Sequence, residues 1–551
     1  MKFVKKYLFI AVFLLALFFR LYKLGEFPVG FLWDEAGLGY NAYSILKTGR
    51  DEYGKLLPLI FKSFGDHKPG FYIYLAVPSI ALLGLNELAV RLPSAIFGSF
   101  SVLFIYLLLK EQNRLKLALI SSTLLAISPW HLSFSRGAWE LNVMTFEILG
   151  GLYFLIKYIN SKKIFYLYVS GIFWILTLFT YQSAKALVPA ILLGFVFFFR
   201  KELKEVSFKP KFGFAVFFLS SFLFFNFLTA TGGRSGRIKV MSVFSYPRSP
   251  EETQMLNEQD GKSRVNWTLF HSAPVFFSRG VLGRYLNHFS GKFLFFSGDW
   301  SNARNGVVYH GVLYLIDVVF LAIGLGILFS RKRTPLENLM LYWLLLAPLP
   351  SAVTRDIISS VRSFTMVIPL TFLAALGVDH FLTFASKSKY FKLPAYLLLV
   401  TCYLLLFFRF LDLYFIHDPK ISSDNRLYGY KQAVQYINPL IGQKDKVVFT
   451  DIYGQPYIFY LFYSKYDPAK YQKQAFLVEN PYGDVGKVER IDNIEFRNIY
   501  WPKDRSFNNS LFIGNEFDLP ITDVVGQNNI TLLKEIEFLD DKTAFRIVET
   551  K

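Results

Sequence analysis

The chain has 551 residues, of which 53% are hydrophobic and 19% aromatic, and its formal net charge is +19. This composition excludes an ordinary soluble multidomain protein and predicts a polytopic membrane protein. The positive charge is divided among short loops and forms no single patch, so we expect no nucleic-acid partner. The single cysteine, Cys402, excludes an intrachain disulfide.

Eleven strongly apolar stretches come close to the length of about 20 residues that a helix needs to cross a bilayer. The first follows a basic N-terminus, and no small-residue cleavage site comes after it, so we expect a retained first helix. The stretches cover approximately residues 7–24, 92–109, 117–130, 139–156, 164–180, 186–199, 212–229, 308–330, 338–354, 362–381 and 393–411.

Six basic clusters lie between these stretches and together hold 20 Lys and Arg against three Glu. Loops with such an excess are typically cytoplasmic. A short apolar run at 71–85 is interrupted by Pro78 and Gly84. If this run crossed the membrane, the five later clusters would lie on the outer side; if it lies on the membrane surface, all six clusters are cytoplasmic. We therefore expect eleven spans in the plasma membrane, with a cytoplasmic N-terminus. The clusters are residues 1–6, 110–116, 157–163, 200–211, 331–333 and 387–392.

The expected fold is thus mainly α, with a transmembrane part at 1–411 and a small extracytoplasmic α/β domain at 412–551. The tail is richer in Asp, Asn and Lys, and Lys446–Thr450 has the pattern of a strand, while helical patterns occur near 427–437 and 453–464. We also expect a first loop, 25–91, and a long loop, 230–307, to lie on the outer side of the membrane.

Three motifs follow one another in the first outer loop. They are Trp33-Asp34-Glu35, then Gly65-Asp66-His67-Lys68-Pro69, and then a motif that begins at Arg91 and continues Leu-Pro-Ser-Ala. This ordered trio resembles the dolichyl-phosphate-mannose–protein mannosyltransferase superfamily (glycosyltransferase family 39-like), which includes the transferases of 4-amino-arabinose to lipid A. The resemblance implies a GT-C fold with surface helices in the first outer loop.

It also implies an inverting transfer of a monosaccharide, mannose or a related sugar, from a polyprenyl-phosphate donor to an acceptor hydroxyl at the outer membrane face. The acceptor is a protein, a glycolipid or a wall polymer. A carboxylate base must take the proton of the attacking hydroxyl. By resemblance this base is Asp34, and Glu35 tunes or positions it. The alternative is that both residues mark a surface helix, with Asp34 as its N-cap.

The leaving lipid phosphate calls for fixed cations. Lys68 comes where the surface helix is expected to begin, an end that favours anions, so we predict that it binds the phosphate; the alternative is a lysine that contacts bulk headgroups. Further candidates for binding the donor phosphate or sugar are His67, Arg91, Arg136, Lys185, His310, Arg355, Arg362 and Tyr40.

Other interpretations stay open. Arg136 lies four residues before Glu140, a spacing that also favours a structural ion pair. Asp299 and Asp317 are alternative catalytic acids. We expect no metal and no other cofactor, since histidine is sparse and the resemblance implies none. A lipid or sugar transporter (a flippase) and an inactive scaffold are the competing function classes, although few spans carry a central charge.

Overall fold

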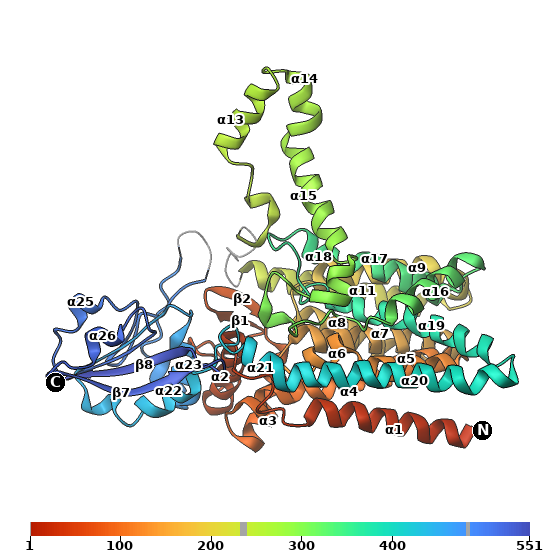
Figure 1. The fold of residues 1–551 in the computed structure, drawn as a ribbon. Helices are drawn as coiled ribbons and strands as arrows, with labels where there is room; N and C mark the ends of the chain where they lie inside the picture. Colours follow the sequence, from red (N-terminus) through yellow and green to blue (C-terminus); the bar gives the residue numbers. More distant parts are fainter. Residues whose placement is uncertain (1, 232–239, 481–484) are drawn as a thin grey trace.

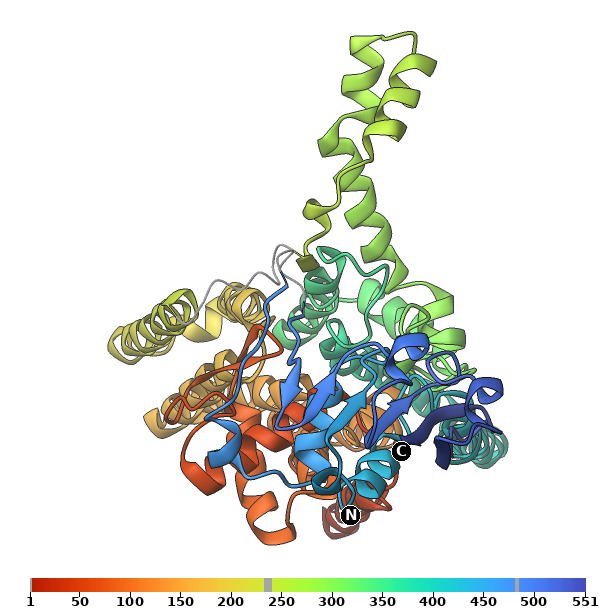
Figure 2. The same cartoon turned by 90° about the vertical axis from the view of Figure 1, so that its left-hand side faces the viewer.

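The computed structural model describes residues 2–231, 240–480 and 485–551, so the part of the long loop at 232–239 lies outside the described residues. A bundle of long helices forms one half of the molecule, and a smaller sheet-containing unit lies at one end of it (Figure 1). A helical hairpin projects sideways from the bundle. Figure 2 looks along the bundle from the end that carries the sheet.

Each predicted apolar stretch coincides with a helix of the bundle. Five of these helices are long and apolar enough to cross a membrane by length and composition, and the others are shorter, so the count of eleven spans stays a prediction. The bundle helices are α1 (Lys2–Leu21), α4 (Glu87–Glu111), α5 (Leu115–Ile127), α7 (Glu140–Ser161), α8 (Ile164–Thr180), α9 (Ala184–Phe198), α11 (Phe208–Thr231), α16 (Asp317–Ser330), α17 (Pro335–Leu346), α19 (Val367–Ala385) and α20 (Lys389–Asp412).

Several basic clusters contact one another at the end of the bundle away from the sheet. Arg114 and Arg331 both pair with the buried Glu337 carboxylate at 2.7 Å. Lys162 pairs with Glu205 at 3.7 Å. Asn160 Nδ2 donates to Glu111 Oε1 at 3.2 Å, which links these two pairs. The clusters at 110–116, 157–163, 200–211 and 331–333 therefore lie at one end, as the topology prediction requires.

The first outer loop contains α2 (Trp33–Thr48), the hairpin of β1 (Ile60–Ser63) and β2 (Asp66–Pro69), and α3 (Phe71–Leu83). Helix α3 has 13 residues and buries Tyr72, Ile73 and Ala76 in a core that it shares with α2, α4 and the sheet unit. A short helix packed into this core agrees with the expectation that the run 71–85 does not cross the membrane.

The long connection after α11 contains η1 (Val243–Ser245), α13 (Pro250–Gln259), α14 (Arg264–Asn266), η2 (Trp267–His271), α15 (Ala273–Asn287), η3 (Lys292–Ser297) and η4 (Ala303–Asn305). Short helices also interrupt the bundle. They are α6 (Pro129–Phe134), α10 (Arg200–Lys204), α18 (Leu349–Ala352), η5 (Phe364–Met366), η6 (Leu413–His417) and α21 (Asp418–Ile421).

The C-terminal unit is built on a six-stranded sheet in the order β4-β5-β3-β6-β8-β7. Strand β3 (Lys446–Phe449), α22 (Tyr430–Ile437) and α23 (Pro456–Tyr463) confirm the patterns read from the sequence. β3 runs parallel to β5 and β6, and the other pairs are antiparallel. The remaining described elements are η7 (Ile441–Gln443), α24 (Pro468–Tyr471), β4 (Arg490–Ile491), β5 (Ile494–Phe496), α25 (Trp501–Asp504), β6 (Ser510–Gly514), α26 (Ile521–Val524), β7 (Ile530–Glu537) and β8 (Thr543–Thr550).

Candidate active site

The N-terminus of α2 gives Asp34 and Glu35 different surroundings. Leu32 is the N-cap residue, and its backbone N–H donates to Glu35 Oε2 at 3.2 Å. The interpretation of Asp34 as an N-cap is therefore wrong, because the carboxylate that caps this helix belongs to Glu35. Asp34 sits one position earlier, and its side chain is 43% exposed.

Glu35 is buried and forms a two-pronged ion pair with Arg91 of α4. Arg91 Nε donates to Glu35 Oε1 at 3.0 Å and Nη2 donates to Oε2 at 3.1 Å. The Ala138 backbone N–H also donates to Glu35 Oε1, at 2.9 Å. A carboxylate with this many partners is committed to holding the structure. The geometry therefore favours the positioning role that the resemblance implies for Glu35 over a direct part in catalysis.

Arg91 likewise differs from its predicted role as a donor-binding residue. It is 1% exposed, and beyond Glu35 it donates to the backbone carbonyls of Leu24, Pro28 and Gly30 at 2.8–3.3 Å. These bonds use all five guanidinium N–H groups. Arg91 therefore fixes the loop that leads into α2, and it has no donor left for a substrate phosphate.

Lys68 forms an ion pair with Asp34. It lies in the strand β2, opposite Phe61 of β1, and not at the start of the surface helix, whose N-cap is Gly70. The helix-terminus argument for Lys68 is therefore wrong, but the strand places its ammonium beside the predicted base. Lys68 is 14% exposed, and its Nζ lies 5.8 Å from the centroid of the Phe64 ring.

Arg304 is a cation of this site that the sequence did not reveal. Its guanidinium lies 4.3 Å from the centroid of the Trp33 ring, next to Asp34 in the chain. Burial lowers the pKa of Arg304, and the negative charge of Asp34 partly offsets this effect. Its only sequence signal is its position in the long loop 230–307, where no local pattern distinguishes it from the other arginines.

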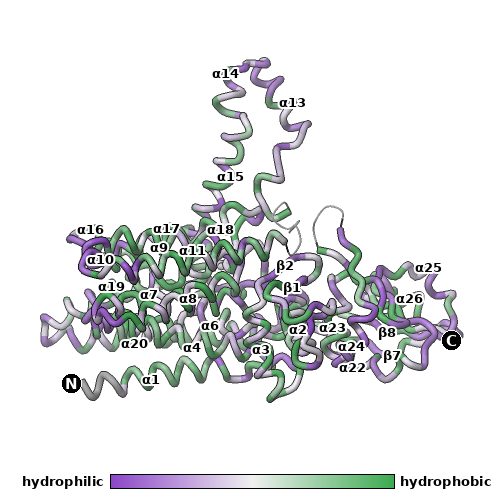
Figure 3. The backbone as a smooth tube through the Cα atoms, turned by 180° about the vertical axis from the view of Figure 1, so that it is seen from behind, coloured by the Kyte–Doolittle hydropathy of each residue, from purple (hydrophilic) through white to green (hydrophobic). Residues whose placement is uncertain are grey.

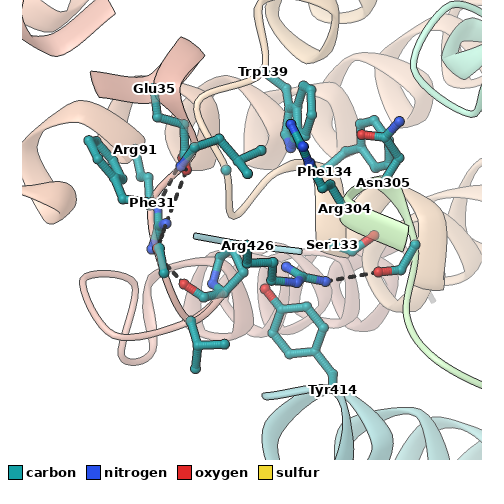
Figure 4. A pocket seen from close by; sticks show the side chains of 16 residues that line it. Phe31, Glu35, Arg91, Ser133, Phe134, Trp139, Arg304, Asn305, Tyr414 and Arg426 are labelled. Atoms are coloured by element: carbon teal, nitrogen blue, oxygen red, sulfur yellow. Dashed lines mark hydrogen bonds and ion pairs between the residues drawn. The ribbon is translucent and has the colours of Figure 1, made fainter. Parts of the chain in front are cut away.

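A small pocket opens beside these residues, between the loop before α2, the turn after α6 and the segment at 304–306 (Figure 4). Arg426 reaches it from the sheet unit, donates to the Gly306 carbonyl at 2.9 Å and pairs with Asp418 at 2.7 Å. Gly30 has a φ of +72°, and a Cβ there would lie 2.1 Å from the Arg426 carbonyl oxygen. The side chains that line the pocket include Glu35, Arg91, Trp139, Arg304, Tyr414 and Arg426.

His67 and Tyr40 flank this region without forming part of the pocket. The His67 carbonyl accepts from Gln182 Nε2 at 2.7 Å, and burial lowers the pKa of the imidazole. Tyr40 is fully buried, and its hydroxyl donates to the Tyr466 carbonyl at 3.1 Å. The structure thus uses Tyr40 to join α2 to the sheet unit, which corrects its predicted contact with a sugar.

Arg136 and His310 are both buried. Arg136 donates to the Tyr414 hydroxyl and to four backbone carbonyls at 2.6–3.5 Å, so its N–H groups are also fully used and its predicted ligand role is not supported. His310 Nδ1 donates to the adjacent Gly311 carbonyl at 2.6 Å.

Three further candidate cations contact other parts of the structure. Lys185 donates to the Thr229 hydroxyl at 3.3 Å, Arg355 donates to the Tyr246 hydroxyl at 3.0 Å, and Arg362 pairs with Asp356. The structure does not bring them into the pocket, and their predicted part in donor binding stays a prediction.

The two alternative catalytic acids, Asp299 and Asp317, accept hydrogen bonds from other residues of the chain. Asp299 accepts from the backbone N–H and the hydroxyl of Ser360, at 2.8 and 3.0 Å. Asp317 accepts from the Tyr403 hydroxyl at 2.7 Å. Both carboxylates are buried, so the exposed Asp34 is the better placed to meet an acceptor hydroxyl.

Residues 67–225 match the family model of dolichyl-phosphate-mannose-protein mannosyltransferases. The crystal structure of ArnT from Cupriavidus metallidurans in the apo state has a TM-score of 0.53 at 12% identity, covering 98% of this chain and 96% of that chain. The same enzyme bound to undecaprenyl phosphate gives 0.54 at 11% identity, covering 98% and 97%.

An uncharacterized protein of Aquifex aeolicus (strain VF5) is 29% identical over 210 residues. The matched part is 37% of this chain and only 40% of that protein. The family match and the whole-chain likeness to ArnT confirm the resemblance read from the three loop motifs. The chain thus has the GT-C glycosyltransferase fold and resembles the dolichyl-phosphate-mannose–protein mannosyltransferase superfamily.

Proposed function

We propose that this chain is an inverting glycosyltransferase that moves a monosaccharide, mannose or a related sugar, from a polyprenyl-phosphate donor to an acceptor hydroxyl at the outer face of the plasma membrane. One observation carries the proposal. An exposed carboxylate, Asp34, pairs with Lys68 and interacts electrostatically with Arg304. The family match and the fold support a glycosyltransferase, and the ArnT complex with undecaprenyl phosphate supports the donor class.

In the proposed reaction the acceptor oxygen attacks the anomeric carbon while the bond from that carbon to the phosphate oxygen breaks. Asp34 accepts the hydroxyl proton, and the polyprenyl phosphate leaves with the electron pair of the broken bond. Lys68 and Arg304 bind the leaving phosphate, whose charge grows in the transition state. Binding of that phosphate draws Lys68 away from Asp34, which leaves the carboxylate free to take the proton.

Glu35 and Arg91 hold this arrangement in place. Their ion pair connects the first turn of α2 to the start of α4, so the backbone that carries Asp34 is fixed from two sides. Among the described residues no group of three or more His, Cys, Asp or Glu gathers in a way that would hold a metal ion, and the proposal assigns no metal ligand. We further propose that residues 1–411 form the catalytic membrane domain and 412–551 an extracytoplasmic domain.

The test compares Asp34→Asn and Lys68→Ala with Glu26→Gln, which removes an exposed carboxylate of the same loop. Donor consumption is measured in membranes that contain the native acceptor, and binding of polyprenyl phosphate is measured on the purified protein. We expect Asp34→Asn to lower turnover by about 10²-fold or more with donor binding retained, and Lys68→Ala to weaken binding. Full turnover by Asp34→Asn would remove the proposed base.

A further inference from the structure

The hairpin of α13, α14, η2 and α15 has no part in the proposed function. It projects from the bundle at a steep angle to the long helices (Figures 1 and 2), and none of the residues of α13, α14 or α15 is buried. At its base, the Tyr285 hydroxyl donates to the Leu345 carbonyl at 2.9 Å, and Asn287 Nδ2 donates to the Ile357 carbonyl at 3.2 Å.

Contacts between the two arms keep the hairpin closed. Arg248 donates to the His271 carbonyl at 2.9 Å, and its guanidinium lies 4.9 Å from the centroid of the Phe276 ring. His271 Nε2 lies 3.2 Å from Asp260 Oδ2 near the tip. The two arms therefore form one unit with a fixed orientation, and each arm presents its own chemistry outward.

The two arms differ in polarity. The α13 arm is acidic, with Glu251, Glu252 and Glu258. The arm of α14, η2 and α15 has no acidic residue, since none occurs between Gly261 and Gly298. It carries Lys262, Arg264, Arg279 and Arg284, together with the large apolar side chains Val265, Leu269, Phe270, Leu282 and Leu286, each of which is 54–66% exposed.

The orientation of the arms matches this difference. The hydrophilic α13 lies on the side of the sheet unit, and the more apolar α15 lies on the side of the bundle (Figures 1 and 3). Because spanning helices run roughly along the membrane normal, a hairpin that crosses their direction runs along the membrane plane. The apolar arm then faces the hydrocarbon region and the acidic arm faces water, the arrangement of an interfacial amphipathic element.

We propose that the hairpin is an in-plane membrane anchor whose α14–α15 arm docks on the leaflet beside the sheet unit. The occupant is a lipid surface with anionic headgroups, because exposed leucine, valine and phenylalanine insert at the acyl boundary while lysine and arginine contact the phosphates. The inference depends on the membrane-spanning character of the bundle and not on the transferase reaction.

The test uses nitroxide labels on the full chain in a Cys402→Ser background, reconstituted in vesicles of phosphatidylcholine and phosphatidylglycerol. Leu269→Cys and Leu282→Cys carry the label on the apolar arm, and Glu258→Cys carries it on the acidic arm as the matched control. All three side chains are exposed, so the labels disturb no packing. The measured quantity is the accessibility to oxygen, which concentrates in lipid, divided by the accessibility to a water-soluble nickel chelate.

We expect this ratio to be several-fold higher at 269 and 282 than at 258. Equal ratios at the three positions would overturn the proposal. Exclusion of both reagents at 269, with dipolar coupling between labels, would indicate a second copy of the chain on this face and would overturn it as well. Charge reversal by Arg264→Glu with Arg279→Glu should lower the ratio at 269. An unchanged ratio would contradict the proposed contact between the basic side chains and the lipid phosphates.

Discussion

Replacing Glu35 with alanine would leave the Arg91 guanidinium without its carboxylate in a place closed to water. The same change would remove the acceptor of the Ala138 and Leu32 backbone N–H groups. Removal of one partner of a buried ion pair typically destabilises a protein by about 3–5 kcal/mol. Arg91 keeps three backbone carbonyls as acceptors, which favours the lower end of that range.

The Ala138 N–H group is buried, so leaving it without an acceptor adds about 1–3 kcal/mol to this destabilisation. We therefore expect Glu35→Ala to lower the free energy of unfolding by about 4–6 kcal/mol. Glu35→Gln keeps an acceptor oxygen of the same reach but loses the charge, so its effect should be about half as large. The double variant Glu35→Ala/Arg91→Met leaves no buried charge unpaired. Its loss in the free energy of unfolding should therefore be smaller, by about 0.5–3 kcal/mol, than the sum of the losses in the two single variants.

The assay combines unfolding in detergent micelles with donor turnover in membranes. If Glu35 positions Asp34, Glu35→Gln loses stability but keeps measurable turnover with an unchanged pH profile. If Glu35 is itself the proton acceptor, Glu35→Gln loses turnover while its stability stays near that of the native chain. The second outcome, or strict additivity of the two single variants, would refute the positioning role.

Three further variants test separate parts of the structure. Arg304→Ala should raise the donor concentration for half-maximal turnover by about tenfold or more, with partial recovery in Arg304→Lys, because a charged hydrogen bond to the phosphate is lost. Burial raises the pKa of Glu52 from 4.5 to about 8, so the folded chain retains a proton that the unfolded chain releases. Stability should therefore fall by at most about 5 kcal/mol as the pH rises through that window, and thermal unfolding of Glu52→Gln across it should not show this fall. Gly30→Ala should lower the melting temperature more than Gly54→Ala, since both have a positive φ but only the former meets the Arg426 carbonyl; equal shifts would contradict the contact.

The sequence predicted the bundle well because span length and hydrophobicity are local properties. Only the resemblance separated Asp34 from Glu35. The residues alone could not, since adjacent residues on a helix point about 100° apart, and packing decides which of them turns inward. It also missed the β1–β2 hairpin. Phe64 and Gly65 both have positive φ, as a tight two-residue hairpin turn requires, and phenylalanine is not a usual signal for such a turn.

Arg304 was beyond sequence reasoning for a different reason. It contacts Trp33, which lies about 270 positions earlier in the chain, and no sequence pattern near either residue indicates this contact. The same distance in sequence explains why Arg91 and Arg136 were assigned to the phosphate. An arginine at the outer end of a span looks the same in the sequence whether its N–H groups meet a ligand or the carbonyls of a distant loop.

The contact between the first outer loop and the C-terminal unit bears on the topology. Phe31 packs against Phe462 with the rings tilted and their centroids 4.8 Å apart, and Lys431 pairs with Glu87 at 2.9 Å. Parts that share a core must lie on the same side of a membrane, so the chain between them crosses an even number of times. Ten of the predicted spans lie in that interval, and a crossing by α3 would make the count odd. One measurement of where the tail lies, for example its accessibility to added protease in intact cells, therefore also fixes the side on which Asp34 works.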